Sequence, residues 1–475
     1  MIMNIVPHIK QFLFVSAATL QTLYKGRALS MLLMFCACSC VVIRPPIAYS
    51  QVQNPARQLT LEGIEIVGNT KTSANVIIRQ LTVRPGDTFS PSEAPVILEA
   101  NRRRLDKTNF FKDVDVYTRP GSEKGKVVFI IEIKERHWPY FQFEGGRSDL
   151  NGWYFVPASL RFDNAFGAGS RFGLKFQIGD RVSKLSLGYH NKIFSDRAFI
   201  DVELFGGGQE FVHYFGDEKF TQDVDSGGLR LRLGGTQGLL KHVFIGYRGE
   251  DYNPDNFATR DTVELGAGQL PASISDNLEK TKVSALTFGL YTDSRDNPAY
   301  PLKGFWGAVT GEVANSDLNS EAGFPKVTLD ARFFQRVLNK SVFALHVKGG
   351  YTTEDAPFYE RFYLGGANSV RGYDDRRLTP AGWGTKLILT NTEFRFPLSK
   401  NNFPYHKTTG VLFFDAGGIW LPGQGVKLDD FFASMGFGIR IKLPVLGTTR
   451  FDFAFPLNKV DDNDFKFHIS LGHTF

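Results

Sequence analysis

Period-two alternation of apolar with polar or small residues runs along residues 139–475 and restricts this part of the chain to β-structure. It is clearest in the last segment, 464–475, and it recurs at 391–398 and 434–443. Successive side chains of a strand point to opposite faces, so each of these segments has one apolar and one polar face. Gly, Asn, Asp and Pro separate the segments, as expected for turns between antiparallel strands.

A soluble sandwich would alternate in the same way, so the residue types decide between a sandwich and a membrane barrel. The apolar positions are mainly Phe, Leu and Ile, and Phe alone accounts for 44 of the 475 residues. The opposite positions carry full charges of both signs next to Gly, which suits a water-filled lumen. No run of about 18 apolar residues follows residue 50, so no membrane-spanning helix is expected there. We therefore predict an all-β transmembrane barrel of about 16 antiparallel strands over 139–475.

Residues 59–138 have a different pattern and follow a short linker, 51–58. Strand-like alternation comes first, then two segments with helical spacing and caps, then two further strands. This order predicts a small α+β domain with its own core. The expected strand, helix, helix, strand and strand cover 59–67, 74–81, 91–108, 114–118 and 126–134.

Residues 1–50 have the composition of a secretory signal peptide. A basic region precedes an apolar stretch, 28–43, and small residues come before a cleavage site expected near Ser50. A retained membrane anchor is the alternative interpretation. No disulfide or thiolate metal site is expected after this segment, because it contains the three cysteines of the chain, Cys36, Cys38 and Cys40.

Charge and motif content argue against several functional classes. Residues 1–50 hold basic but no acidic residues, so the formal net charge of +6 falls close to +2 for the rest of the chain. That excess is too small for a nucleic-acid binder. No serine-hydrolase elbow, zinc-protease motif or phosphate-binding loop occurs. We therefore predict no enzymatic activity, catalytic residue, cofactor or metal, and no nucleic-acid partner.

The long connection 353–383 contains the most specific motif of the chain. It lies between the eleventh and twelfth expected strands, which makes it the sixth external loop if the chain enters the barrel from the periplasm. Gly365 and Gly366 allow tight turns. The residues that follow them in the motif are Val370, Arg371, Gly372 and Tyr373.

This loop motif resembles the outer-membrane assembly-factor superfamily, which includes BamA and TamA. In that family a Val-Arg-Gly-Tyr or Val-Arg-Gly-Phe tip lies on the sixth external loop, which folds back into the barrel. Residues 293–305 and 411–417 also resemble family hairpin and strand motifs, and 59–138 has the element order of a POTRA (polypeptide-transport-associated) domain. The chain end resembles the signal by which barrels are recognised for assembly, with apolar positions at Phe467, Ile469, Leu471 and Phe475.

The resemblance implies a partner for Arg371. The family places an acidic residue of its Phe-x-Asp-x-Gly strand opposite the loop arginine, and here that residue is Asp415. A guanidinium in a partly desolvated lumen needs such an acceptor, and a bidentate pair would hold the loop against the wall. The alternative is that Arg371 is an ordinary arginine of a surface loop.

The closure between the first and last strands is the second candidate site. The first strand, 140–146, is short and ends in Gly145 and Gly146, and the last strand has Gly472 near its end. Few strong ladder bonds are expected there, so the seam could open sideways and expose a strand edge. An ordinary seam with frayed ends is the alternative.

The function implied by the resemblance is assembly of client β-barrel proteins in the bacterial outer membrane through this seam, with the POTRA domain in the periplasm. The implied partners are unfolded outer-membrane proteins, membrane lipid, and periplasmic chaperones or accessory proteins that contact the POTRA domain. Two alternatives stay open. One is a polypeptide-secretion transporter of the same superfamily, and the other is a passive porin-like barrel.

Overall fold

The computed structural model describes the chain from residue 58 onward, with short internal gaps. The expected signal peptide and nearly all of the linker lie outside the described residues, as do Gly472 and Phe475. The gaps are residues 109, 137–138, 165, 194–197, 238–239, 261–262, 271, 276–277, 299, 339–340, 399–407, 444–446, 462–463 and 472–475.

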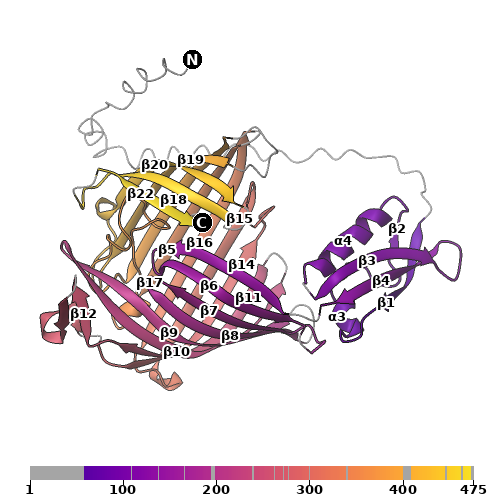
Figure 1. Cartoon of the computed structure of the whole chain (residues 1–475), viewed down its shortest axis with the longest axis horizontal. Helices are drawn as coiled ribbons and strands as arrows, with labels where there is room; N and C mark the ends of the chain where they lie inside the picture. Colours follow the sequence, from indigo (N-terminus) through magenta and orange to yellow (C-terminus); the bar gives the residue numbers. More distant parts are fainter. Residues whose placement is uncertain are drawn as a thin grey trace, which may run out of the picture. The chain divides into compact units, whose positions relative to one another are not determined.

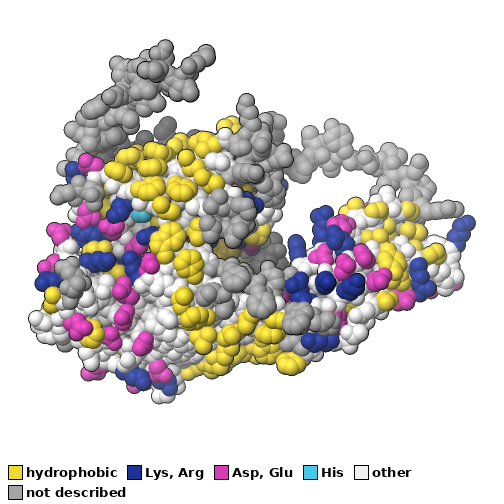
Figure 2. All heavy atoms as spheres, viewed as in Figure 1, with side chains coloured by type: hydrophobic (Ala, Val, Ile, Leu, Met, Phe, Trp, Pro, Cys, Tyr) yellow, Lys and Arg dark blue, Asp and Glu magenta, His cyan; other side chains and the backbone are white. Residues whose placement is uncertain are grey.

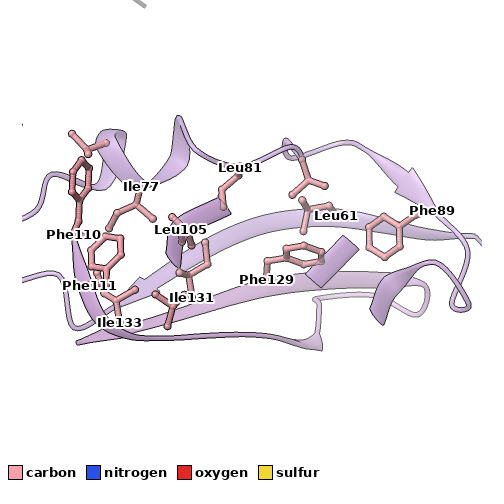
Figure 3. Close-up of a cluster of buried hydrophobic side chains, with 13 residues drawn as sticks. Leu61, Ile77, Leu81, Phe89, Leu105, Phe110, Phe111, Phe129, Ile131 and Ile133 are labelled. Carbon is pink, nitrogen blue, oxygen red and sulfur yellow. The ribbon is translucent and has the colours of Figure 1, made fainter. Parts of the chain in front are cut away.

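The small N-terminal domain is a four-stranded sheet with two helices (Figure 1). Its strand order is β2-β1-β4-β3, in which β1 runs parallel to β4 and β3 runs antiparallel to it. Alternate residues of the sheet meet the helices in an apolar core, where Leu61, Phe129 and Ile131 are fully buried beside Leu105 (Figure 3). The elements are β1 Leu59–Val67, α3 Ala74–Ile78, β2 Thr88–Phe89, α4 Ala94–Asp106, β3 Phe111–Pro120 and β4 Lys126–Glu135.

Both helices are shorter than predicted, and the two-residue strand β2 was not predicted. The second helix begins at Ala94 rather than at Pro91, and residues 91–93 form a turn before it. Ser90 and Glu93 make reciprocal hydrogen bonds across this turn. The first helix ends at Ile78, and the Arg84 guanidinium binds the carbonyl oxygens of Ile78 and Leu81.

The second domain is a barrel of 16 antiparallel strands, as predicted, in which the strand order brings β22 next to β5 (Figure 1). A hairpin, β12–β13, lies in the connection between β11 and β14, which pair with each other directly. The barrel strands are β5 Tyr140–Ser148, β6 Gly152–Asp163, β7 Arg171–Gly179, β8 Val182–Ile193, β9 Ala198–Phe215, β10 Glu218–Gln237, β11 Leu240–Pro254, β14 Thr281–Asp293, β15 Gly304–Ala314, β16 Phe324–Leu338, β17 Ser341–Thr352, β18 Lys386–Pro397, β19 Thr408–Trp420, β20 Phe432–Leu443, β21 Gly447–Pro456 and β22 Lys466–Leu471.

The long connection after β11 has regular structure of its own. It consists of β12 Phe257–Arg260, β13 Val263–Gly266, a 3-10 turn at Ala267–Gln269 and the short helix α5 Ala272–Ser275. A small apolar cluster that includes Leu265, Leu270 and Ile274 holds these pieces together. Three other 3-10 turns lie at Ser316–Leu318, Phe358–Glu360 and Leu428–Asp430.

The alternating pattern places apolar side chains on the outside of the barrel. Phe437 and Ile439 on β20 and Phe467 and Ile469 on β22 are exposed, and Figure 2 shows hydrophobic side chains gathered over the barrel strands. Within the part of the chain that the structure describes, no helix has both the length and the apolar character to cross a membrane. In the same residues, no cluster of three or more His, Cys, Asp or Glu side chains could hold a metal ion.

The inner face differs from the prediction in one respect. Its charged residues were expected to line water, but along β18 to β21 they are buried. The reason is that residues 353–385 fold into the barrel and pack over them, with Val370, Leu364 and Tyr373 in contact with Leu389 and Ile419 of the wall. We call residues 353–385 the lumen loop.

Candidate functional site

Glycines shape the turn of the lumen loop that contains the predicted motif. Gly365, Gly366 and Gly372 have φ values of 103°, 119° and 98°, which side chains other than glycine rarely adopt. Space is short as well, because a Cβ atom on Gly366 would lie 2.5 Å from the Asp149 carboxyl carbon. The predicted turn positions therefore match the backbone that the loop requires.

Arg371 lies fully buried between the lumen loop and the wall. Its Nε donates to Asp415 Oδ2 at 2.6 Å and its Nη2 donates to Asp415 Oδ1 at 2.8 Å, which is the bidentate geometry expected for this pair. Nη1 donates to Glu393 Oε1 at 2.8 Å, and the guanidinium lies 3.6 Å from the centre of the Phe413 ring. The loop arginine is thus bound by two carboxylates and a ring.

A second group of side chains fixes Asp415. Asn391 Nδ2 donates to Asp415 Oδ1 at 2.9 Å and to the carbonyl oxygen of Ser369 at 2.7 Å. The Asn391 carbonyl oxygen therefore faces His346, whose Nδ1 lies 2.9 Å away. Because Nδ2 donates to two oxygens, Oδ1 of Asn391 must be the acceptor of this last bond. One amide thus holds the loop backbone and the carboxylate that binds Arg371.

The carboxylates of the wall are shared with other arginines. Glu393 also accepts from Arg395, and its Oε1 lies 3.3 Å from Nη2 of Arg440. Arg440 in turn pairs with Asp452. Buried charges of this kind are tolerated only when they are paired and hydrogen-bonded, and the alternation of sign across β18, β20 and β21 meets that condition.

The rest of the motif contacts the last strands. The Gly372 N–H donates to His468 Nε2 on β22 at 3.1 Å. The Tyr373 hydroxyl donates to the carbonyl oxygen of Asn458 at 2.9 Å. Val370 is fully buried among apolar wall residues. The motif therefore reaches from β18 to the strand beside the seam.

The seam residues are only partly described. Gly145 and Gly146 are near the end of β5, where Cβ atoms would lie 3.3 Å from the Phe155 ring and 2.8 Å from the Tyr154 hydroxyl. Among the described residues the β21–β22 ladder spans Thr449 to Ala454 on β21. β22 and β5 are hydrogen-bonded neighbours that close the barrel. Of the predicted assembly signal, Phe467 and Ile469 face outward, and Leu471 ends β22.

Sequence reasoning missed two further anchors of the lumen loop. Glu360 accepts from Arg248 on β11 at 2.8 Å and from Lys326 on β16 at 3.0 Å. Burial raises the pKa of Glu360, but Lys326 and Arg248 outweigh it and lower this pKa to about 2. The other anchor joins Asn368 and Asp375 to the β5–β6 hairpin. No spacing in the sequence links these residues, since their partners lie 34 to 228 positions away.

Family models match most of the described chain. The model described as Omp85 superfamily domain matches residues 164–475, and the model described as Surface antigen variable number repeat, a POTRA model, matches residues 59–136. Together the two matches leave out only the start of the barrel and the residues before 59.

Curated relatives include assembly factors from two bacteria. "Outer membrane protein assembly factor BamA" of Nitratidesulfovibrio vulgaris is 25% identical over 442 residues, covering 88% of this chain and 52% of the relative. The protein of the same name from Neisseria meningitidis is 23% identical, covering 89% of this chain and 57% of the relative. The chain thus spans about half the length of the curated relatives it matches.

Solved structures share the fold. BamA from Haemophilus ducreyi lacking POTRA domains 1–3 superposes with a TM-score of 0.67 at 18% identity, covering 87% of this chain and 84% of that one. CdiB from Acinetobacter baumannii superposes with a TM-score of 0.53 at 15% identity, covering 88% and 74%. At these identities the likeness concerns the fold alone.

Proposed function

The chain belongs to the Omp85 superfamily, and from this premise we propose that it folds client β-barrel proteins into the outer membrane through the seam between β5 and β22. Membership agrees with the resemblance that the loop motif suggested. The barrel lies in the outer membrane and its POTRA domain lies in the periplasm. Client insertion, the open seam and the partners are our proposal.

The observation that carries the proposal is the unequal support of the barrel wall around the lumen loop. Arg371 fixes the loop to β18 and β19 through a buried bidentate pair. On the seam side, by contrast, β5 begins with a register shift between Gln142 and Glu144. A barrel that is rigid beside a weak seam can open there without unfolding, and the edge it exposes is a template for a client strand.

The POTRA domain supplies a candidate site for incoming clients. β3 lies at one edge of its sheet and is ten residues long, from Phe111 to Pro120. An unfolded client could add a strand to this edge through main-chain hydrogen bonds, whatever its sequence. Assembly would need no nucleotide, because the client's own folding free energy and local thinning of the bilayer would drive insertion.

Reconstitution in liposomes tests the function. We expect unfolded barrel proteins to acquire heat-modifiable mobility faster with the purified protein than in empty vesicles. Insertion at the rate of empty vesicles would contradict the assembly role. A steady large conductance in planar bilayers would instead indicate the porin-like alternative.

Engineered cysteines test the seam separately. Joining the external end of β5 to β22 by a disulfide should abolish insertion, and reduction should restore it. A matched disulfide between two wall strands, β18 and β19, should leave insertion unchanged because these strands need not separate. If the oxidised seam variant inserts clients normally, the seam has no part in the mechanism.

Polypeptide secretion is the second candidate function. The fold likeness to CdiB at a TM-score of 0.53 favours keeping it. A secretion transporter would deliver a polypeptide across the vesicle membrane into the aqueous interior, whereas an insertase would leave it in the bilayer. Protease protection of the client distinguishes the two products.

A further inference from the structure

The β5–β6 hairpin, the first of the barrel, ends in a buried carboxylate that faces the lumen loop. Asp149 lies in the turn between the two strands and is 2% exposed. Both of its oxygens accept the backbone N–H of Asn368, at 3.0 and 3.1 Å. The Asn368 side-chain amide donates to the carbonyl oxygen of Arg147 at 3.0 Å. One loop residue thus binds the hairpin through its main chain and its side chain.

Two adjacent charged residues of the loop hold the same hairpin. Asp375 accepts from Nη2 of Arg147 at 2.7 Å and from Nη1 of Arg181 at 3.2 Å. The Arg376 guanidinium donates to the carbonyl oxygen of Asp149 at 3.2 Å and to that of Leu150.

Arg376 is fully buried, and its φ of 65° lies in the left-handed region that costs free energy for a residue with a side chain. A strained, buried arginine whose guanidinium binds carbonyl groups of a hairpin turn fixes the position of that turn.

The same short stretch of loop also binds the other side of the seam. The Gly372 N–H donates to His468 on β22, and Lys466 on β22 pairs with Asp374. Arg450 on β21 binds the side chain of Asn368. Residues 368–376 therefore contact strands on both sides of the junction of β22 with β5 that closes the barrel.

We infer that residues 368–376 form a clasp that holds the seam closed, with Asp149, Asp375 and Arg376 as positioning residues that fix the β5–β6 hairpin to the loop. This role rests on the proposed opening of the seam. The Arg371 pair anchors the loop to β18 and β19, so the loop stays with the wall when the clasp releases. The hairpin is then the part that moves.

In this arrangement the loop adds its own bonds to the strand pairing that holds β5 beside β22. A hairpin that swings away from β22 must break the Asn368 bonds to Asp149 and the Asp375 bond to Arg147. It does not need to break any bond of Arg371. Substitutions in the clasp should therefore open the seam while the wall keeps its structure, which separates the two sets of residues by experiment.

Spin labels on the lipid-facing side of the full-length protein measure this opening. Exposed Phe155 on β6 and exposed Phe455 on β21 flank the seam and accept Phe→Cys substitutions, in a background where Cys36, Cys38 and Cys40 are serine. A second pair at Ile388 on β18 and Phe437 on β20 reports the wall. Electron-electron double resonance in liposomes gives the distance distribution of each pair.

We expect Asp149→Ala and Asp375→Ala to lengthen and broaden the 155–455 distance and to leave the 388–437 distance unchanged. The matched control is Asp217→Ala. It removes an exposed carboxylate that pairs with Arg377, and Arg377 lies in the lumen loop. Asp375→Asn provides a milder variant if truncation prevents folding, which retention of heat-modifiable mobility reports. Equal 155–455 distributions in parent, Asp149→Ala and Asp375→Asn proteins would overturn the clasp.

The outcome of client insertion separates this inference from the proposed function. A longer 155–455 distance in the clasp variants supports the clasp even if liposomes show no client insertion. Absence of insertion would count against the assembly role alone. An unchanged distance in proteins that insert clients would overturn the clasp and leave the assembly role standing.

Discussion

The lumen loop touches two stretches of barrel wall that are held together in different ways. β18 and β19 pair without a register shift from Lys386 and Trp420 to Pro397 and Thr409, and their inward charges are buried and paired. On the seam side, the β5–β6 and β6–β7 ladders both contain register shifts. The wall holds the loop through its own structure, whereas we propose that the closed seam depends on the loop.

Because of this difference, we expect substitutions in the two stretches to change different properties: the free energy of unfolding on the wall side and the opening of the barrel on the seam side. Removing one partner of a buried charge pair leaves an unpaired charge in a desolvated site, which is among the costliest single changes in a folded protein. Bonds between a loop and a hairpin turn can break locally, since few ladder bonds must break with them. Substitutions on the wall should therefore lower global stability, and substitutions at the hairpin should change the seam first.

Arg371→Ala should have the largest effect. It leaves Asp415 and Glu393 without their shared cation, and loss of one partner of a buried ion pair costs about 3–5 kcal/mol. We expect a lower temperature of loss of the heat-modifiable form and slower client insertion. Urea unfolding in detergent micelles, followed by tryptophan fluorescence, measures the free energy of unfolding.

Arg377→Ala is the matched control for Arg371→Ala. Arg377 lies in the same loop and pairs with Asp217, which is almost fully exposed, and with Asp461, which is partly exposed, so the loss should be smaller than for Arg371→Ala. If Arg371→Ala melts and inserts clients like the parent protein, the loop is not held by this pair.

Asp415→Asn should have a smaller effect of the same kind. The substitution keeps the shape and removes the charge, and Arg371 retains Glu393 as a partner. Hydrogen bonds to charged groups contribute about 1.5–3 kcal/mol, so we expect a loss in that range by the same urea measurement. An effect as large as that of Arg371→Ala would mean that Glu393 contributes little to binding Arg371.

The sequence predicted the strands of the barrel, and the reason is physical. The strands follow from period-two alternation, which every barrel strand repeats because one face meets lipid, and the structure has the 16 antiparallel strands that were predicted. The loop motif was recognisable because it resembles a family motif, and its Gly365, Gly366 and Gly372 adopt the left-handed backbone that suits glycine. These are local signals.

The partners of Asp149, Glu360 and Asn391 leave no local signal. Each is one polar residue whose meaning depends on a contact more than 20 positions away, made only when the loop has entered the barrel. The expected water-lined inner face was wrong along β18 to β21 for the same reason, since alternation reports that a side chain points inward but not what fills the space.

A change of pH should alter the stability contributed by the loop contacts on the seam side and not by those on the wall side. Burial, together with the neighbouring Asp375 carboxylate, raises the pKa of Asp149 from 3.8 to about 7. The native state therefore favours the protonated form, and its stabilising contribution is complete below about pH 4 and is lost as pH rises through 7. The charged or titratable groups around it are Asp375, Arg147, Arg376, Arg181, Arg450, Lys348 and Tyr363.

We expect the melting temperature of the parent protein to fall by a few degrees between pH 5 and pH 8. The Asp149→Asn protein, which cannot ionise at this position, should lose most of that slope. Differential scanning fluorimetry at constant ionic strength measures both curves. Equal slopes in the two proteins would assign the pH dependence to another group.

Loss of an aromatic contact on the lipid-facing side should have the smallest effect on the free energy of unfolding. This effect should not differ between the wall side and the seam side. Phe437 and Phe453 stack with ring centres 5.2 Å apart and an interplanar angle of 19°, and both face the outside of β20 and β21. Truncation by Phe453→Ala forfeits about 0.5–1.5 kcal/mol of ring contact, because lipid replaces much of the rest. Urea unfolding should show this loss with unchanged insertion, and Phe453→Leu should recover part of it. A loss near that of Arg371→Ala would mean that the outer surface, rather than the buried charges behind the loop, keeps the wall rigid while the seam opens.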